Sequence, residues 1–194
     1  MLNDLKEKFE KLETPEELMD FLATYITYGW YGKDGNLRID TIAEFSAQYQ
    51  LSSLSEVLES GKGVCFEEIE LAREFFVRKK IPFQTYIIQG RRVAHAILIY
   101  QEGKWFHQIR YLSPKNFGAV SAYNVEVLLQ DEVTGFMNEY KIKELDKVKL
   151  VSYGKLPDRA DAATIKQIIL EKENLIPEAF QERLFADQPT MGLK

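Results

Sequence analysis

The chain has little of several features that mark particular classes of protein. It holds one cysteine and two histidines among 194 residues, so it forms no internal disulfide and lacks the Cys pairs and His-x3-His spacing of metal sites. No run approaches the roughly 18 apolar residues of a membrane span. The segment after Met1 is charged and amphipathic, without an apolar signal core. We therefore expect a cytoplasmic protein with no metal and no cofactor.

A basic region is also absent. The 25 Lys and Arg residues are interspersed with 30 Asp and Glu residues, for a net charge of -5. Because this mixture leaves no extended basic patch, we expect neither nucleic acid nor a membrane surface as a partner. The apolar fraction of 45% is enough for one core in a chain of this length. We expect a single domain over residues 1–185 and a flexible polar tail over 186–194.

The apolar pattern that is present predicts helices, then strands, then helices. The elements predicted in the first half are helices over 2–12, after Thr14-Pro15-Glu16-Glu17, over 38–50, and from Ser53 or Ser55 to Ser60-Gly61, with a turn at Asp34-Gly35. Those predicted later are strands at 83–88, 93–100, 105–111 and 148–153, and helices at 124–140, from Asp158 to Glu171 and from Pro177. This order favours an α+β fold, with a Cys-bearing helix on an antiparallel sheet and flanking helices.

The only cysteine stands where a turn gives way to a helix. Gly61 and Gly63 permit backbone conformations that other residues avoid, and apolar residues recur at helical spacing from Phe66 to about Lys79. At a helix N-terminus the free N–H groups and the macrodipole favour an anion, which shifts the Cys65 thiol toward the nucleophilic thiolate. A buried structural cysteine is the alternative, since free cysteines are among the most buried residues.

A thiolate nucleophile needs a group that takes and returns its proton, and His95 lies on the strand that follows the Cys-bearing helix. If Glu102 and Gly103 form a two-residue hairpin loop, His95 and Gln108 lie diagonally on one sheet face and His107 points to the other. The Gln108 amide then accepts the imidazole N–H and fixes its tautomer. A one-residue shift would put His107 there instead. The alternative for His95 is a core histidine bonded to backbone.

Three motifs carry a resemblance to a known family. They are Gly63-Val64-Cys65 before a helix, Lys80-Ile81-Pro82-Phe83 before the strand Tyr86-Ile87-Ile88, and Ala94-His95-Ala96 before Gly103-Lys104-Trp105. With them, residues 50–130 resemble the transglutaminase-like superfamily within the papain-like cysteine fold, and are most similar to small bacterial transglutaminase-like proteins. The spacing from Cys to Ile-Pro is the most specific part of this resemblance.

The resemblance implies that Cys65 is the nucleophile and His95 the base. The family's third member, usually an acid on the second hairpin strand, falls on Gln108, or on Ile109 if the Trp is aligned rigidly, and neither is an acid. An amide third residue, as in papain-like enzymes, is one explanation and a weakened or incomplete triad is another. The family's glycine before Ile-Pro is replaced by Lys80.

The implied reaction is attack by Cys65 on an amide or ester carbonyl, followed by transfer of the acyl group to water or an amine. The Cys65 N–H supplies one oxyanion donor. Candidates for a second donor are Trp30, Gln48 and Gln50, and candidates for a substrate carboxylate are Arg91 and Arg92, although core packing or solvation explains each more simply. Glu67 and Glu68 complement the helix dipole and oppose thiolate formation slightly.

Two functional hypotheses follow from the sequence. The first is a transglutaminase-like cysteine hydrolase or acyltransferase that acts on an amide bond of a peptide or small molecule. The second is a non-catalytic descendant of the same fold that binds a peptide or partner protein, and the missing acid favours it.

Overall fold

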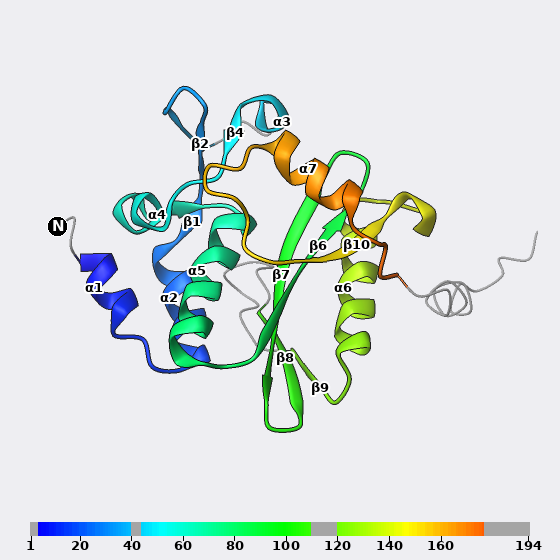
Figure 1. Cartoon of the computed structure of the whole chain (residues 1–194), viewed down its shortest axis with the longest axis horizontal. Coiled ribbons are helices and arrows are strands. Elements are labelled where there is room, and N and C mark those ends of the chain that lie inside the picture. The colour runs from blue at the N-terminus through cyan, green and yellow to red at the C-terminus, as the bar shows by residue number, and fades with distance from the viewer. Residues whose placement is uncertain (1–3, 40–43, 110–119, 177–194) are drawn as a thin grey trace, which may run out of the picture.

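We describe a computed structural model of the chain over residues 4–39, 44–109 and 120–176 (Figure 1). Its helices are α1 (Asp4–Glu10), α2 (Pro15–Tyr25), α3 (Phe45–Gln48), α4 (Leu54–Ser60), α5 (Cys65–Lys79), α6 (Val125–Glu139) and α7 (Ala162–Glu171), with a 3-10 turn, η1 (Leu145–Lys147). Its strands are β1 (Thr27–Tyr28), β2 (Trp30–Gly32), β3 (Leu37–Arg38), β4 (Tyr49–Gln50), β5 (Lys62–Gly63), β6 (Phe83–Gln89), β7 (Ala94–Glu102), β8 (Trp105–Ile109), β9 (Val120–Ala122) and β10 (Lys149–Tyr153). The α+β class predicted from the sequence is confirmed. No described helix is long and apolar enough to cross a membrane.

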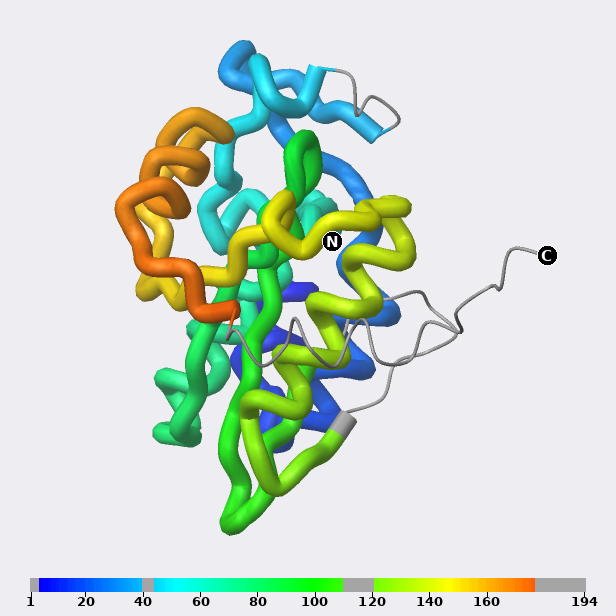
Figure 2. Tube along the Cα trace, turned by 90° about the vertical axis from the view of Figure 1, so that its right-hand side faces the viewer, coloured from blue at the N-terminus to red at the C-terminus, as the bar shows by residue number. Residues whose placement is uncertain are grey.

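The centre of the fold is an antiparallel sheet in the order β10-β6-β7-β8-β9, with α5 on one face and α6 on the other (Figures 1 and 2). Side chains alternate between the two faces of a strand. Ala96 and Leu98 of β7 belong to the apolar core on the α5 side, whereas Ile97 and Ile99 belong to the core on the α6 side. Position along β7 therefore decides which helix a side chain meets.

Local signals fix both ends of α5. Val64 is extended (φ -115°) and its N–H donates to the Glu67 carboxylate (3.1 Å), which closes the first turn. At the other end Lys80 has φ 56°, in the left-handed region. This conformation costs a residue other than glycine roughly 1–2 kcal/mol. Lys80 thus ends α5 in a conformation that glycine adopts more readily.

The turn before α5 is held by backbone pairing. The predicted Ser53 cap of α4 is confirmed, and α4 ends at Gly61 with φ 63°. A Cβ at Gly61 would lie 2.9 Å from the Tyr25 carbonyl oxygen, so both conformation and space require glycine there. The next strand, β5, pairs in parallel with β1. This pairing delivers Cys65 to the start of α5 in a defined position.

Two of the predicted helices differ in the structure. Residues 38–50 do not form one helix, because Arg38 lies in β3 and Tyr49 pairs with Gly32 of β2. The capping residue of α7 is Asp161 rather than Asp158, since the Asp161 carboxylate accepts the Thr164 N–H (2.8 Å). The piece predicted from Pro177, the predicted domain end at residue 185 and the tail over 186–194 lie outside the described residues.

The hairpin register also differs from the predicted one. Glu102 pairs with Trp105, so Gly103 and Lys104 form the loop and the pairing is shifted by two residues. Gly103 has φ 59°, which suits the first loop position of a type II′ turn. The prediction had put this glycine second in the loop. As a result Gln108 pairs with Ile99, farther along the sheet than expected.

Candidate active site

Cys65 is the first residue of α5 and lies against β7. Its sulfur lies near two backbone N–H groups, those of Ala96 on β7 and Phe66 on α5, and both lower the pKa of the thiol. The side chain is partly buried at the edge of the core on the α5 side of the sheet. The predicted position at a helix N-terminus is therefore confirmed.

The predicted shift toward thiolate is wrong for this structure. Burial raises the pKa of the Cys65 thiol to about 12, and the nearby carboxyl groups of Glu68 and Glu67 raise it further, against the lowering effect of the two N–H groups. Removal of the thiolate from water outweighs the attraction of a helix N-terminus, because desolvation of a charge is the larger effect. At neutral pH the structure holds a neutral thiol.

Four tyrosines surround Cys65 closely enough to interact with its charge. They are Tyr28, Tyr49, Tyr140 and Tyr153, and burial is the main cause of the raised pKa of each. Tyr49 and Tyr153 are buried, whereas Tyr28 and Tyr140 are 38% and 43% exposed. Cys65 is thus nearest to solvent on the side of Tyr28 and Tyr140. Sequence reasoning missed these tyrosines, since they come from four separate segments.

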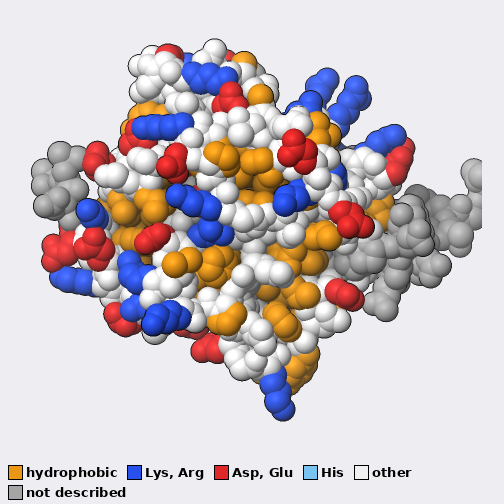
Figure 3. Space-filling model, viewed as in Figure 1, with side chains coloured by type: hydrophobic (Ala, Val, Ile, Leu, Met, Phe, Trp, Pro, Cys, Tyr) orange, Lys and Arg blue, Asp and Glu red, His pale blue; other side chains and the backbone are white. Residues whose placement is uncertain are grey.

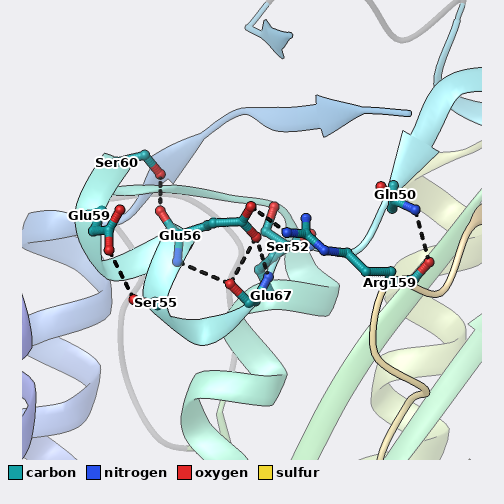
Figure 4. Close-up of polar contacts among 9 residues, drawn as sticks. Gln50, Ser52, Ser55, Glu56, Glu59, Ser60, Glu67 and Arg159 are labelled. Atoms are coloured by element: carbon teal, nitrogen blue, oxygen red, sulfur yellow. Dashed lines mark hydrogen bonds and ion pairs between the residues drawn. The ribbon is translucent and has the colours of Figure 1, made fainter. Parts of the chain in front are cut away.

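Glu67 is a structural carboxylate beneath the site. Besides the Val64 N–H, it accepts hydrogen bonds from the Tyr49 hydroxyl (2.9 Å) and the Ser52 N–H (3.1 Å). Figure 4 shows Glu67 reaching from α5 toward Ser52. Burial raises the pKa of Glu67 to about 7, although these hydrogen bonds lower it. Its bonds tie the turn before Cys65 to the segment that precedes α4.

Glu68 lacks a comparable network. It is 4% exposed, and its Oε1 atom has no hydrogen-bond partner among the described residues. Burial raises the pKa of Glu68 to about 8, with a further contribution from the charge of Glu67. A buried carboxyl oxygen without a hydrogen bond is costly, so a structural role does not explain it.

His95 lies on the α6 side of β7. It pairs with Ile88, which belongs to the core on that side, and its ring lines a cavity of about 390 Å³ together with Thr134 and Glu139 of α6. Burial lowers the pKa of His95 to about 4, opposed by the charge of Glu139. Within the described part of the chain, no hydrogen bond joins His95 to Cys65. The imidazole is therefore neutral, and burial makes its protonation unfavourable in this position.

The Cys65 sulfur nevertheless lies close to the backbone of the strand that carries His95. The Ala96 N–H lies near the Cys65 sulfur, and the carbonyl carbon and Cα of His95 are the only atoms between the Ala96 nitrogen and the His95 Cβ. The Cβ therefore lies within roughly 8 Å of the sulfur. Between the described residues, β8 pairs with β7 only from Leu98 onward. A turn of the His95 side chain over the edge of β7 would bring its ring toward the sulfur.

Gln108 does not meet His95. The two share a sheet face, as predicted, but Gln108 lies opposite Ile99, four residues along β7 and so about 13 Å away. Gln108 is fully buried, and neither its amide nitrogen nor its amide oxygen has a partner among the described residues. The predicted hydrogen bond between this amide and the imidazole is absent.

His107 points to the other face, as predicted. Its ring stacks on Tyr100 with ring centroids 5.0 Å apart, and its Nδ1 lies 2.8 Å from the Ser121 hydroxyl. His107 therefore takes no part in the site. No group of His, Cys, Asp and Glu in the described ranges is arranged to hold a metal ion.

The candidates for a second oxyanion donor and for binding a substrate carboxylate lie in other parts of the structure. Trp30 is buried against Phe45 and Tyr49, and its indole N–H has no partner within the described segments. The Gln50 amide donates to the Arg159 carbonyl (3.4 Å, Figure 4). Gln48 ends α3, and Arg91 and Arg92 are exposed in the bend between β6 and β7. The hydrogen bonds of the described chain link none of these candidates to Cys65.

A comparison with protein-family models finds none that matches this chain, and a comparison with curated proteins finds none either.

Proposed function

We propose that the protein is a transglutaminase-like cysteine hydrolase or acyltransferase with a papain-like core, acting on an amide of a peptide or small molecule. The observation that carries this proposal is the approach of the Ala96 N–H to the Cys65 sulfur, close enough to lower the pKa of the thiol. It joins the start of the Cys-bearing helix to the residue next to His95. Thiol acyl transfer requires the nucleophile and base side chains to come within hydrogen-bond reach, and this approach places His95 where a movement of its ring could achieve that.

The reaction follows from the chemistry of these groups. The Cys65 proton passes to the His95 imidazole, the sulfur attacks the carbonyl carbon, and the carbonyl oxygen takes the negative charge near the Cys65 N–H. The imidazolium then protonates the leaving amine, the C–N bond breaks and a thioester remains. Water or a second amine attacks this thioester, returns its proton through His95 and releases the thiol.

Substrate binding has a specific task in this scheme. The His95 ring must turn from the α6 side of β7 toward the sulfur, and the thiol must lose its proton in a buried setting. Both changes are unfavourable in the free protein, because the Cys65 pKa is about 12 and the His95 pKa about 4. We infer that a bound amide supplies the energy for both.

The proposal includes a class of substrate and a cellular location. Lys and Arg side chains lie among Asp and Glu on the face viewed in Figure 3, which supports a peptide or small amide rather than nucleic acid as substrate. A cytoplasmic location agrees with a catalytic thiol that must stay reduced.

Hydroxylamine trapping tests the proposed reaction. The protein is incubated with a peptide mixture and hydroxylamine, and acyl hydroxamates are detected by mass spectrometry. We expect hydroxamates with the wild type and none with Cys65→Ala, whereas equal yields from both proteins would refute the proposal. The peptides that react also identify the amide class.

Two observations favour a second function. The Cys65 thiol is neutral, and Cys65 and His95 lie on opposite sides of β7. In this alternative the protein binds a peptide or partner protein without turnover. It predicts that wild type and Cys65→Ser retain the same peptides on an immobilised column and that neither yields hydroxamates. Loss of binding in Cys65→Ser counts against it.

A further inference from the structure

Glu68 lies three residues after Cys65 on α5. Residues three apart on a helix are neighbours, with Cβ atoms about 5–6 Å apart. Helical side chains also lean toward the N-terminus of the helix, which directs Glu68 to the turn that carries Cys65. Consistent with this geometry, Glu68 is the charged group with the largest influence on the Cys65 thiol.

The hydrogen bonds of the described residues do not account for this carboxyl group. Glu68 is 4% exposed and its Oε1 atom lacks a partner among them, whereas the adjacent Glu67 is bonded to Val64, Ser52 and Tyr49. The two neighbouring glutamates thus differ in their hydrogen bonding. Glu67 holds the turn together, and Glu68 presents an unused polar atom to the site.

We propose that the carboxyl O–H of Glu68 donates a hydrogen bond to the negative charge that forms at the Cys65 sulfur, which makes Glu68 a catalytic residue of this site. The inference rests on the proposed function for the reaction in which the charge forms. When the Cys65 proton passes to His95, the Glu68 proton stays on its own oxygen and only a hydrogen bond is made.

Electrostatics support this geometry. Burial raises the pKa of Glu68 to about 8, so the carboxyl group is protonated at neutral pH and has an O–H to donate. The titratable groups around the pair are Glu67 on α5, Tyr28 on β1, Tyr49 on β4, Tyr140 after α6 and Tyr153 on β10. The tyrosines have raised pKa values and stay neutral, so Glu67 is the main charge in this set that opposes ionisation of Glu68.

Carbon-13 NMR of glutamate carboxyl groups in the full chain tests the protonation directly. The Glu68 resonance is assigned as the one missing from Glu68→Gln, and we expect it to titrate near pH 8. A midpoint near the ordinary value of 4.5 would overturn the proposal. This measurement requires no substrate, so its result is independent of the proposed function.

Alkylation by iodoacetamide tests the donor. Glu68→Gln keeps a donor and Glu68→Leu removes it, while neither side chain can ionise. We expect Cys65 in Glu68→Gln to react about tenfold faster than in Glu68→Leu, since a hydrogen bond to a charged group is worth about that factor or more. Equal rates would overturn the proposal, because Glu68 would then act only as a charge.

The matched control is Glu74→Gln, an exposed change on the same helix, which should match the wild type in alkylation. Thermal unfolding of all variants verifies that each is folded. If the donor effect is present but hydroxamates never form, the proposed function fails and the pairing of Glu68 with Cys65 stands.

Discussion

The backbone N–H of Ala96 lies close enough to the sulfur of Cys65 to lower the pKa of the thiol, while the side chain of the preceding residue, His95, lies on the other side of β7. The Cys65 sulfur therefore lies beside the backbone of the residue that follows His95, whereas the His95 side chain lies on the opposite side of the strand. Activation of the thiol then depends on a movement of one imidazole ring, and the free protein should show little of it.

The ionisation of Cys65 should be suppressed in the free protein. Burial and two glutamates raise the pKa of the thiol to about 12. Because Cys65 is the only cysteine, the ultraviolet absorbance of the thiolate during a pH titration reports this group alone, after correction with Cys65→Ala for tyrosine ionisation. We expect a midpoint well above that of free cysteine, about 8.5. A midpoint below that value would contradict the described electrostatics.

Removal of the Glu67 carboxylate should destabilise the fold. Glu67→Ala leaves the buried Tyr49 hydroxyl and the Val64 and Ser52 N–H groups without their acceptor. We expect the free energy of unfolding to fall by about 2–4 kcal/mol, measured by urea denaturation. Tyr49→Phe, which loses one of these bonds, should cost about 1 kcal/mol. Glu74→Gln, exposed on the same helix, is the control and should change little.

Stability should fall as pH rises from about 6.5 to 8. Glu67 and Glu68 have pKa values of about 7 and 8 in the folded protein against 4.5 for an ordinary glutamate, so the folded state binds more protons in this window. The free energy of unfolding then decreases with pH. His95 acts in the opposite direction only below 6.5, the pKa of an ordinary histidine. Glu68→Gln should remove most of the decline above pH 7, and a wild type whose stability is flat or rises across the window would contradict these values.

Replacement of Gln108 by leucine should be neutral or stabilising. The amide is fully buried, and within the described chain neither of its polar atoms has a partner. An apolar side chain of similar size removes the desolvation cost, which is about 1–3 kcal/mol. We expect an unchanged or higher unfolding temperature and an unchanged rate of acylation at Cys65. A large loss of acylation in a folded Gln108→Leu protein would restore Gln108 to the catalytic group.

The parts of the fold that were predictable are those with strong local signals. Thr14 and Glu17 form the predicted capping box, and Ser53, Gly61 and the start of α5 at Cys65 stand where the sequence places them. The helix predicted over 38–50 failed because Phe45 and Tyr49 stack on each other and meet Trp30 edge to face, a tertiary contact that the helical spacing does not reveal.

The positions of the candidate residues were predictable only in part. Cys65 and His95 come to the same stretch of β7, but the face on which His95 lies follows from the alternation along the whole strand. The position of Gln108 depended on one turn, in which Gly103 is the first rather than the second loop residue. In the sequence, Glu68 lies at helical spacing from Cys65 and cannot be told apart from a solvated surface charge. Its burial in the structure distinguishes it.

Acylation of Cys65 by a reactive ester tests the central claim most directly. The protein is mixed with p-nitrophenyl acetate, quenched in acid, and the acetylated peptide is located by mass spectrometry. We predict one acetyl group on Cys65 in the wild type, formed about 100-fold more slowly in His95→Ala, in the range expected for loss of a general base. Acetylation at equal rates in both proteins, or none at Cys65, would contradict a Cys65–His95 acyl-transfer site.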